Sequence, residues 1–360
     1  MKILLSGFCL LSFLSLSAQD SLTILFAGDA MMHQKQLDNT RRGDFFDLGS
    51  YFANIEREVK AVDIAVVNFE VPLGGEPYSG YPVFSAPEDF ALALQKAGFD
   101  FFLLANNHCL DRRTRGFVRT IQALDSLGIR HTGTFLDCDH RHRTYPMLLR
   151  KKDFRIIMLN YTYGTNGLKV DIPRIVNYID KEIMKGDIAE AKLFNPDFII
   201  ANMHWGLEYE RIPSREQREL ADWLRQGVDL VIGSHPHVVQ PMELRRGKEG
   251  VTDRLVVYSL GNFISNMSRE HTDGGVMVKV VLGRKGLRRY IISAQYSLIY
   301  SSRYKNEQGK EDIRVVPAAS WSGKNQNSSF SVDSALIKYV NNTRLFLKGN
   351  NKEVEEYIFE

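Results

Sequence analysis

Seven apolar segments of strand length recur along residues 22–263, and this recurrence constrains the fold more than any other feature of the chain. The segments are rich in valine, isoleucine and phenylalanine, as central strands buried on both faces are. Their ranges are 22–29, 62–70, 100–108, 154–164, 197–206, 229–237 and 254–263. A chain of 360 residues can bury these strands in one large α/β domain or in two smaller ones.

Amphipathic segments separate the apolar ones and predict helices over 112–128, 173–194 and 214–227. Ser214 is the expected N-cap of the last of these helices, and Gly227 follows its end. This alternation predicts an α/β sheet with helices on its faces. Because no internal repeat or low-complexity linker divides the chain, we expect a single domain.

The pattern changes after Phe263, where two segments alternate in the manner of hairpin strands. We expect them to complete a second sheet that packs against the first. A polar stretch over 303–330 predicts a loop, and residues 331–349 predict an amphipathic terminal helix. The expected organisation is a core over 22–265, further strands over 266–302, and a polar loop with a C-terminal helix over 303–360.

The first residues have the pattern of a secretory signal peptide. Lys2 precedes an apolar run over 3–17 that is too short for a transmembrane helix, and a small residue, Ala18, marks the expected cleavage site. A signal peptide over 1–18 predicts an exported protein of the periplasm or cell surface. The alternative is an uncleaved membrane anchor.

Charge and cysteine content narrow the function classes further. The net charge is only +3 and no long basic run occurs, which excludes nucleic acid as an expected partner. The mature chain keeps two cysteines, Cys109 and Cys138. An oxidising compartment would allow them to form a disulfide, but two cysteines do not make a disulfide framework, and we expect two free thiols.

Most of the apolar segments end in residues that bind metals or transfer protons. In an open α/β sheet, ligands bind at the carboxyl ends of the strands, so these side chains are expected to meet along one edge. His235 and His237 lie two positions apart on an extended segment and therefore point to the same side. The residues are Asp29, Glu70, Asn107 with His108, His204, and His235 with His237.

Carboxylates, an amide oxygen and neutral imidazoles form a ligand set suited to divalent Zn, Mn or Fe. The sequence therefore predicts one or two such ions, which would lower the pKa of bound water and polarise a phosphoryl or carbonyl oxygen. Each residue also has a structural alternative. Asp29 and Asp111 could cap helices, Glu70 could belong to a turn, and His204 could be a hydrogen-bonded core histidine. Their coincidence at successive strand ends favours a site.

Six motifs in this order resemble the CapA family of capsule and poly-γ-glutamate synthesis proteins, which have a calcineurin-like metallophosphoesterase fold. They are GDAMMH (28–33), NFEVPL (68–73), LANNHCLD (104–111), HWGLEY (204–209), GSHPHVVQP (233–241) and YSLGNF (258–263). The resemblance spans about residues 22–265. It implies a four-layer αββα sandwich in a single domain.

The resemblance also implies roles for individual residues. The implied metal ligands are Asp29, Glu70, Asn107, His204, His235 and His237. His108 matches the general acid of metallophosphoesterases, and Asp111 would orient its ring. Glu208 and Tyr209 match the family's HWGxEY motif and are assigned to the substrate pocket. Asn106 and Asn262 are further substrate-binding candidates.

One position departs from the broader superfamily, whose members carry a histidine two residues after the first aspartate. Here Met31 stands at that position, and a thioether is a poor ligand for hard divalent ions. One of the two usual ion sites therefore lacks a ligand unless His33 substitutes. A single ion, or a second ion bound weakly, is the expectation.

Three functions are compatible with these observations. The first is a metal-dependent hydrolase or transferase that acts on an anionic envelope polymer, such as a capsule or poly-γ-glutamate chain, or on its precursor. The second is a non-catalytic accessory protein of a membrane synthase or export complex. The third is a periplasmic phosphoesterase for small phosphoesters. The fold does not decide among them.

Overall fold

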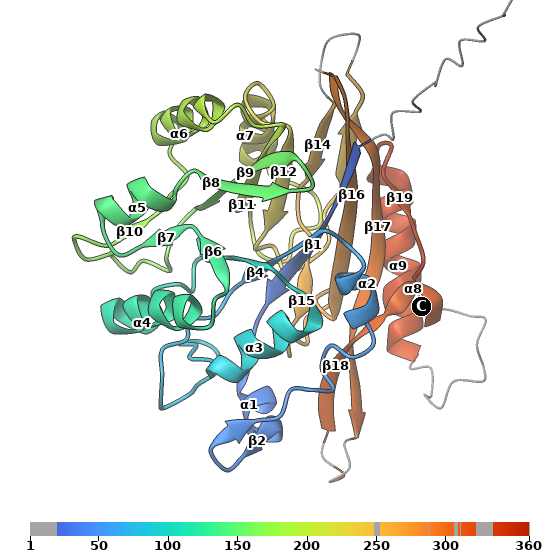
Figure 1. The fold of residues 1–360 in the computed structure, drawn as a ribbon. Coiled ribbons are helices and arrows are strands. Elements are labelled where there is room, and N and C mark those ends of the chain that lie inside the picture. The colour runs from blue at the N-terminus through green and yellow to red at the C-terminus, as the bar shows by residue number, and fades with distance from the viewer. Residues whose placement is uncertain are drawn as a thin grey trace, which may run out of the picture.

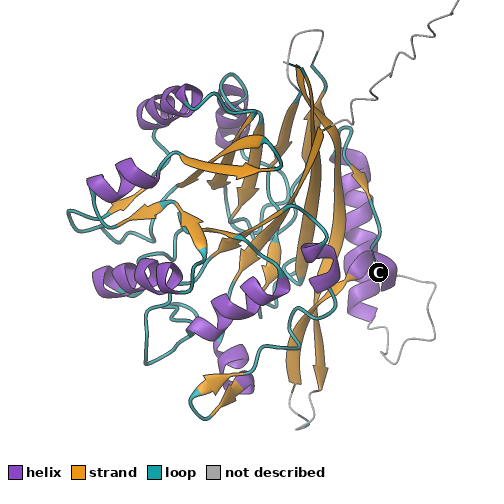
Figure 2. Ribbon diagram, viewed as in Figure 1, coloured by secondary structure: helices purple, strands orange, loops and turns teal. Residues whose placement is uncertain are grey.

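The computed structural model describes residues 20–247, 253–286, 288–305, 309, 311–321 and 334–359. The predicted signal peptide over 1–18 lies outside these residues. Two β-sheets pack face to face, and helices cover their outer faces (Figures 1 and 2). This arrangement confirms the expected four-layer α/β sandwich.

The first sheet has the strand order β18-β17-β16-β1-β4-β5-β6, with β15 also paired to β1 and β19 to β17. Its parallel part comprises β1 (Asp20–Ala30), β4 (Ile64–Phe69), β5 (Phe101–Leu103) and β6 (Arg130–Thr132). Its antiparallel part comprises β16 (Gly274–Lys285), β17 (Arg288–Lys305) and β18 (Glu311–Pro317). The two added strands are β15 (Asn262–Ile264) and β19 (Glu355–Glu356).

The second sheet has the order β13-β14-β12-β11-β9-β8. Its four inner strands are parallel: β9 (Phe154–Thr162), β11 (Phe198–His204), β12 (Leu230–Ser234) and β14 (Arg254–Val257). Antiparallel strands close both edges: β8 (Met147–Lys151) and β13 (Met242–Arg245). Two short pairs lie outside the sheets: β2 (Arg41–Arg42) with β3 (Phe45–Phe46), and β7 (Thr134–Phe135) with β10 (Ile175–Val176).

The main core lies between the two sheets and follows the two-residue period of the strands. On β1, Ile24 and Phe26 face the second sheet, where they join Ile156 and Ile200 in one buried cluster. The alternate residues, such as Leu25, belong to a separate cluster beneath the helices on the outer face. Both faces of β1 are therefore buried, which explains its continuous apolar sequence.

Helices cover the outer faces of both sheets. The first sheet is covered by α2 (Glu56–Lys60), α3 (Glu88–Ala97) and α4 (Arg113–Ser126), and the second by α6 (Lys181–Leu193) and α7 (Arg215–Leu224). The long helix α9 (Ser334–Asn350) instead joins the inter-sheet cluster through Leu336, Tyr339 and Val340, beside β17. The remaining helices are α1 (Gln34–Thr40), α5 (Cys138–Thr144) and α8 (Ala318–Trp321).

All seven apolar segments form strands, but they divide between two sheets. Segments 22–29, 62–70 and 100–108 enter the first sheet, and 154–164, 197–206 and 229–237 enter the second. Segment 254–263 divides, with β14 in the second sheet and the start of β15 in the first. The predicted hairpin is confirmed as β16 and β17. It extends the sheet of β1 and does not complete the second sheet as predicted, because β16 pairs antiparallel with β1 from Arg284 opposite Asp20 to Met277 opposite Ala27.

Two predicted boundaries differ from the structure. The polar stretch expected to be a loop from 303 contains the end of β17 and all of β18, while residues 322–330 lie outside the described ones. The helix expected over 173–194 begins only at Lys181, where the Asp180 side chain accepts hydrogen bonds from two backbone amides of the first turn. The residues before it pair with β7 instead.

Cys109 is buried, Cys138 is exposed, and both are free, as expected. Across the described residues, the helices are too short or too polar to cross a membrane.

Candidate metal centre

The carboxyl ends of the parallel strands from both sheets meet at one place, as their polarity predicts. Asp29 is the second-last residue of β1 and Glu70 directly follows β4. His204 ends β11, and His235 directly follows β12. All four side chains are buried.

A glycine allows the first of these ends to form. Asp29 donates its backbone N–H to the Gly261 carbonyl oxygen at 3.0 Å, which draws β1 against the loop before β15. A Cβ atom on Gly28 would lie only 1.9 Å from that same oxygen, so no other residue fits there. The pairing register of β1 with β4 shifts at this position, which places Asp29 opposite Asn68.

The Asp29 carboxylate joins the two sheets. Its Oδ2 lies 3.0 Å from His237 Nδ1 and 3.3 Å from the backbone nitrogen of His235. Asn262 Oδ1 lies 3.1 Å from the same His237 nitrogen. Asn262 Nδ2 donates to the Thr272 carbonyl, which fixes Oδ1 as an acceptor. With two acceptors facing it, His237 Nδ1 is placed to donate a hydrogen bond.

Asn68, on β4, contacts three members of the cluster. Its Nδ2 lies 2.8 Å from Asp29 Oδ1, 3.3 Å from Glu70 Oε2 and 3.3 Å from His204 Nδ1. It stands two positions before Glu70 and so points to the same side of the strand. The motif NFEVPL contains this residue, but the sequence analysis assigned only its glutamate. The two-residue spacing was the signal that could have identified it.

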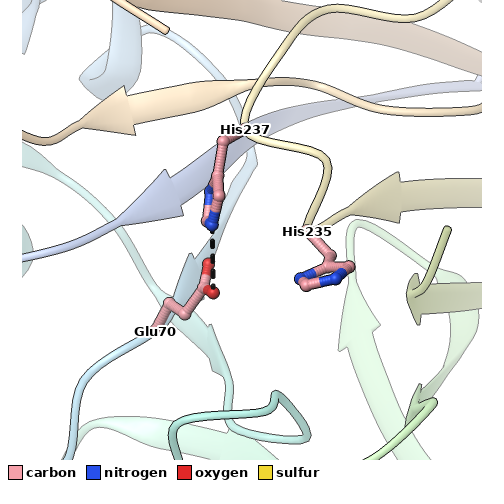
Figure 3. A group of neighbouring side chains, drawn as sticks. All are labelled: Glu70, His235 and His237. Atoms are coloured by element: carbon pink, nitrogen blue, oxygen red, sulfur yellow. Dashed lines mark ion pairs between the residues drawn. The ribbon is translucent and has the colours of Figure 1, made fainter. Parts of the chain in front are cut away.

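Glu70, His204 and Asn107 form the centre of the cluster. His204 Nε2 lies 2.8 Å from Asn107 Oδ1 and 3.5 Å from Glu70 Oε1. His237 Nε2 lies 3.9 Å from the same Glu70 oxygen, and Figure 3 shows these two side chains pointing toward one another with His235 beside them. Glu70 Oε1 has no hydrogen-bond partner although it is fully buried.

His235 and His237 both have positive φ angles, +100° and +59°. Non-glycine residues rarely adopt this conformation, and it is concentrated at functional sites. The His235 ring packs against Tyr163, with ring centroids 4.5 Å apart, and against His204 at 4.7 Å. Its Nδ1 is a second buried atom without a hydrogen-bond partner. Tyr163 covers the two histidines from the solvent side, since its own side chain is 47% exposed.

Burial shifts the titrating groups of the cluster in opposite directions. Desolvation, reinforced by the nearby Asp29, raises the pKa of Glu70 well above its usual value. Desolvation and neighbouring histidines lower the pKa of His204 well below its usual value and that of His235 to about 3. Both shifts favour neutral groups at a place where carboxylates and imidazoles converge.

These residues fit a divalent cation. Two groups bring their ligand atoms within 4.8 Å of one another: Glu70 with His235 and His237, and Asp29 with Glu70 and His204. Glu70 belongs to both groups, and its Oε1 and His235 Nδ1 are buried without partners. Carboxylate oxygen and neutral imidazole nitrogen are ligands that Zn, Mn and Fe accept. An ion would satisfy both unpartnered atoms.

Met31 and His33 do not restore the missing ligand. Met31 is buried in the apolar cluster beneath the outer helices. His33 caps α1, and its Nδ1 accepts the backbone N–H of Asn266 at 3.2 Å. Neither group of possible ligands found among the described residues includes His33.

His108 and Asp111 form a buried pair next to the cluster. His108 Nδ1 lies 2.8 Å from Asp111 Oδ2, and that oxygen also accepts the backbone N–H of Phe84 at 2.8 Å. Arg112, not Asp111, is the N-cap residue of α4. Asn166, which the sequence analysis missed, accepts a hydrogen bond from Asn107 and lies 3.5 Å from His108 Nδ1. It follows β9 in a loop that carries no family motif.

The four substrate-pocket candidates occupy different positions. Asn106 turns away from the cluster: it donates to the Phe69 carbonyl and accepts from the His108 backbone N–H. Asn262 holds His237, as described above. Glu208 is exposed and Tyr209 half-buried at the mouth of the cluster, with the Tyr209 ring centroid 6.2 Å from that of His237. Burial and the adjacent Glu208 raise the pKa of Tyr209 to about 12.

Comparison with known proteins places this geometry in a family. Residues 23–267 match the family described as bacterial capsule synthesis protein PGA_cap. The capsule biosynthesis protein CapA of Bacillus anthracis is 28% identical over 284 residues, which cover 74% of this chain and 65% of that protein. The PGA biosynthesis protein CapA of Bacillus subtilis (strain 168) is 27% identical over 290 residues, covering 77% and 72%. The chain therefore spans just under two thirds of the first relative.

One solved structure agrees at the level of the fold. The NAD nucleotidase of Haemophilus influenzae superposes with a TM-score of 0.50 at 12% identity, covering 91% of this chain and 67% of that one. The calcineurin-like phosphoesterase YfkN from Bacillus subtilis gives a TM-score of 0.48 at 15% identity, covering 91% and 98%. The first likeness concerns the fold alone, and the second carries no argument. Because the family match extends over more than half of the sequence, from before Asp29 to beyond Asn262, this chain belongs to the bacterial capsule synthesis protein PGA_cap family.

Proposed function

We propose that the protein is an exported, metal-dependent hydrolase or transferase that acts on an anionic envelope polymer of the capsule or poly-γ-glutamate type, or on its precursor. The observation that carries the proposal is the pair of unpartnered buried atoms, Glu70 Oε1 and His235 Nδ1, within a converging set of carboxylates and imidazoles. Such atoms are costly to bury unless something binds them. The names of the two Bacillus relatives, which refer to capsule and PGA biosynthesis, support an envelope polymer as the substrate.

In this proposal one or two divalent ions of Mn, Zn or Fe are held by Asp29, Glu70, Asn107, His204, His235 and His237. A bound ion supplies Lewis acidity and a water of lowered pKa. Asn68 keeps both carboxylates in place through its two hydrogen bonds to them. Tyr163 shields the imidazoles from solvent.

His108 is proposed to act as the general acid. The Asp111 carboxylate, fixed by the Phe84 backbone N–H, holds the proton on His108 Nδ1 and orients the ring. Protonated on both nitrogens, the imidazole can transfer its Nε2 proton to a leaving-group oxygen or nitrogen. Asn166 accepts a hydrogen bond from Asn107 and lies beside the pair.

Export and partners belong to the same proposal. The signal-like sequence before Asp20 would deliver the protein to the periplasm or cell surface, where envelope polymers are assembled. A membrane synthase or export complex would be the partner there.

Turnover by the purified mature protein tests the proposal. The protein is stripped of metal, reconstituted with Mn, Zn or Fe(II), and assayed against γ-linked oligoglutamate, nucleotides and sugar phosphates. We expect metal-dependent cleavage or transfer of the polymer. Turnover of small phosphoesters alone would make the protein a phosphoesterase. Metal binding without any turnover, together with co-purification of a membrane synthase, would make it an accessory protein.

A further inference from the structure

An exposed arginine stands at the mouth of the metal centre without a charged partner. The guanidinium carbon of Arg269 lies 4.1 Å from the centroid of the Tyr209 ring. Throughout the described part of the chain, this guanidinium forms no ion pair and no side-chain hydrogen bond. Its N–H donors therefore remain available for a ligand, because stacking on an aromatic face uses the plane of the group and not its edge.

The acidic residues near Arg269 do not occupy it. Glu270, its neighbour in sequence, pairs with Lys338 of α9 at 3.6 Å. Glu208 interacts with the Tyr209 hydroxyl. Arg211 adds a second cation two residues beyond Tyr209; its guanidinium lies 3.8 Å from the Phe346 ring, and its Nε and Nη2 have no partner. Within the described residues, Arg269 therefore forms no ion pair with either carboxylate.

Tyr209 is fixed to the segment that carries two metal-ligand candidates. Its backbone N–H donates to the Pro236 carbonyl at 2.8 Å, between His235 and His237. Its φ angle is +69°, an uncommon conformation for a tyrosine. This hydrogen bond holds the Tyr209 backbone against the segment that carries His235 and His237.

The loop of Arg269 is tied to the same segment from the other side. The Thr272 backbone N–H and hydroxyl both donate to the Arg269 carbonyl, at 3.1 and 2.6 Å. The Thr272 carbonyl in turn accepts from Asn262, whose Oδ1 faces His237 Nδ1. Both members of the stack are thus anchored, by independent hydrogen-bond chains, to the residues that hold the ion.

We propose that Arg269, positioned by Tyr209, binds an oxyanion of the substrate (a carboxylate or a phosphate) next to the group that reacts at the metal centre. The planar guanidinium edge matches two oxygens of either anion. The inference rests on the proposed function in requiring an anionic substrate. It adds the residue that would distinguish a charged polymer from a neutral one.

The test uses the metal-loaded mature protein, Arg269→Gln, Arg269→Lys, and Arg143→Gln as a control at an exposed arginine of α5. Each is assayed with γ-linked oligoglutamate, with the same oligomer after amidation of its free carboxylates, and with a sugar phosphate. Equilibrium dialysis measures Kd for the same three probes, so the inference can be tested without turnover.

We expect Arg269→Gln to raise KM or Kd for the oligoglutamate roughly 10- to 100-fold with little change in kcat, and Arg269→Lys to recover part of the loss. The amidated oligomer should bind all forms alike. If Arg269→Gln weakens binding of the sugar phosphate equally, Arg269 belongs to a general anion site. If binding of the sugar phosphate is unchanged, the site is specific for carboxylates. Unchanged oligoglutamate binding by Arg269→Gln would overturn the inference. If the wild type binds through Arg269 but turns nothing over, only the proposed catalytic function fails.

Discussion

The two sheets contribute different chemistry to the candidate metal centre. The first sheet brings oxygen groups and an amide donor to its edge, and the second sheet brings imidazoles. The first set comprises Asp29, Asn68, Glu70 and Asn107, and the second comprises His204, His235 and His237. Each sheet edge alone holds an incomplete ligand set, so the centre exists only where the inter-sheet core packs the two together.

Burial shifts the pKa of groups from the two sheets in opposite directions. Burial and Asp29 raise the pKa of Glu70, which favours its protonated form. Burial and the neighbouring rings lower the pKa of His204 and His235, which favours their neutral forms. A cation between them would reverse the first shift and reinforce the second, because it favours carboxylate anions and neutral imidazoles alike.

The largest expected effect comes from removing two of the imidazoles that the second sheet contributes. In a His235→Ala/His237→Ala double variant, we expect bound metal and metal-dependent turnover to be lost. In the wild type, Mn at about 1,000 times its Kd should stabilise the fold by about 4 kcal/mol, because it binds only the native state. In the double variant Mn should leave Tm unchanged.

Elemental analysis and thermal melts with and without a chelator measure both effects. His142→Ala, at an exposed histidine of α5, is the matched control. If the double variant kept its metal, the carboxylates of the first sheet would hold the ion without His235 and His237. The proposal that both sheets supply ligands would then be wrong.

The next effect separates proton transfer from ion binding. His108→Ala should lower kcat by roughly 10²–10⁴-fold while leaving bound metal unchanged, the range typical of a general acid. Asp111→Asn should lower kcat less, because the amide can still contact both His108 and the Phe84 backbone N–H. Steady-state kinetics beside elemental analysis check this. Retained turnover in His108→Ala, with any substrate found, would remove His108 from the mechanism.

Strand polarity explains which parts of this two-sheet arrangement could be predicted from the sequence. The apolar segments and the polar residues at their ends identify the centre, because parallel strands place their carboxyl ends on one edge. The segments carry no mark that assigns them to one sheet or the other. That division depends on which strands pair, as β16 with β1, and such pairing is a tertiary property.

The residues that could not be predicted from the sequence contact the candidate ligands and the candidate acid and would hold or cover them. Asn68 and Asn166 hold ligand and acid candidates by hydrogen bonds from positions whose residue type suggests no chemistry. Tyr163 acts by covering the imidazoles, from a loop directly after β9. Met31 shows the converse. Its identity alone indicated a missing ligand, and the structure buries it among apolar side chains.

A smaller effect is expected among the residues of the first sheet, where Asn68 contacts both carboxylates. Asn68→Leu removes the donor shared by Asp29 and Glu70 while keeping the side-chain volume. Since two buried carboxylates then lose a hydrogen bond, the metal-free protein should be destabilised by about 1–3 kcal/mol. Asn68→Asp should cost more, because it adds a third buried acid.

Urea unfolding with chelator, and again with Mn, measures these changes. The difference between the two Asn68 variants should shrink when metal is bound, since a cation offsets the added charge. Equal free energies of unfolding for wild type and Asn68→Leu in chelator would show that Asn68 does not stabilise the Asp29 and Glu70 carboxylates.

The smallest effect concerns His33, which lies at the edge of the cluster and links it to α1. Burial, followed by the proximity of His237, lowers the pKa of His33 from 6.5 to about 4. The unfolded chain therefore binds a proton at a higher pH than the folded one. The contribution to stability is present above pH 6.5 and is lost as pH falls from 6.5 toward about 4. Protonation would also remove the acceptor for the Asn266 backbone N–H.

His33→Asn keeps a good N-cap residue for α1 but removes the titration. Between pH 7 and pH 5, the metal-free wild type should lose roughly 1–2 kcal/mol more stability than this variant. Other buried histidines of the cluster contribute equally to both proteins, so the difference isolates His33. His142→Asn should behave as the wild type does. Parallel stability–pH curves for wild type and His33→Asn would show that His33 takes up its proton as readily in the folded state as in the unfolded one.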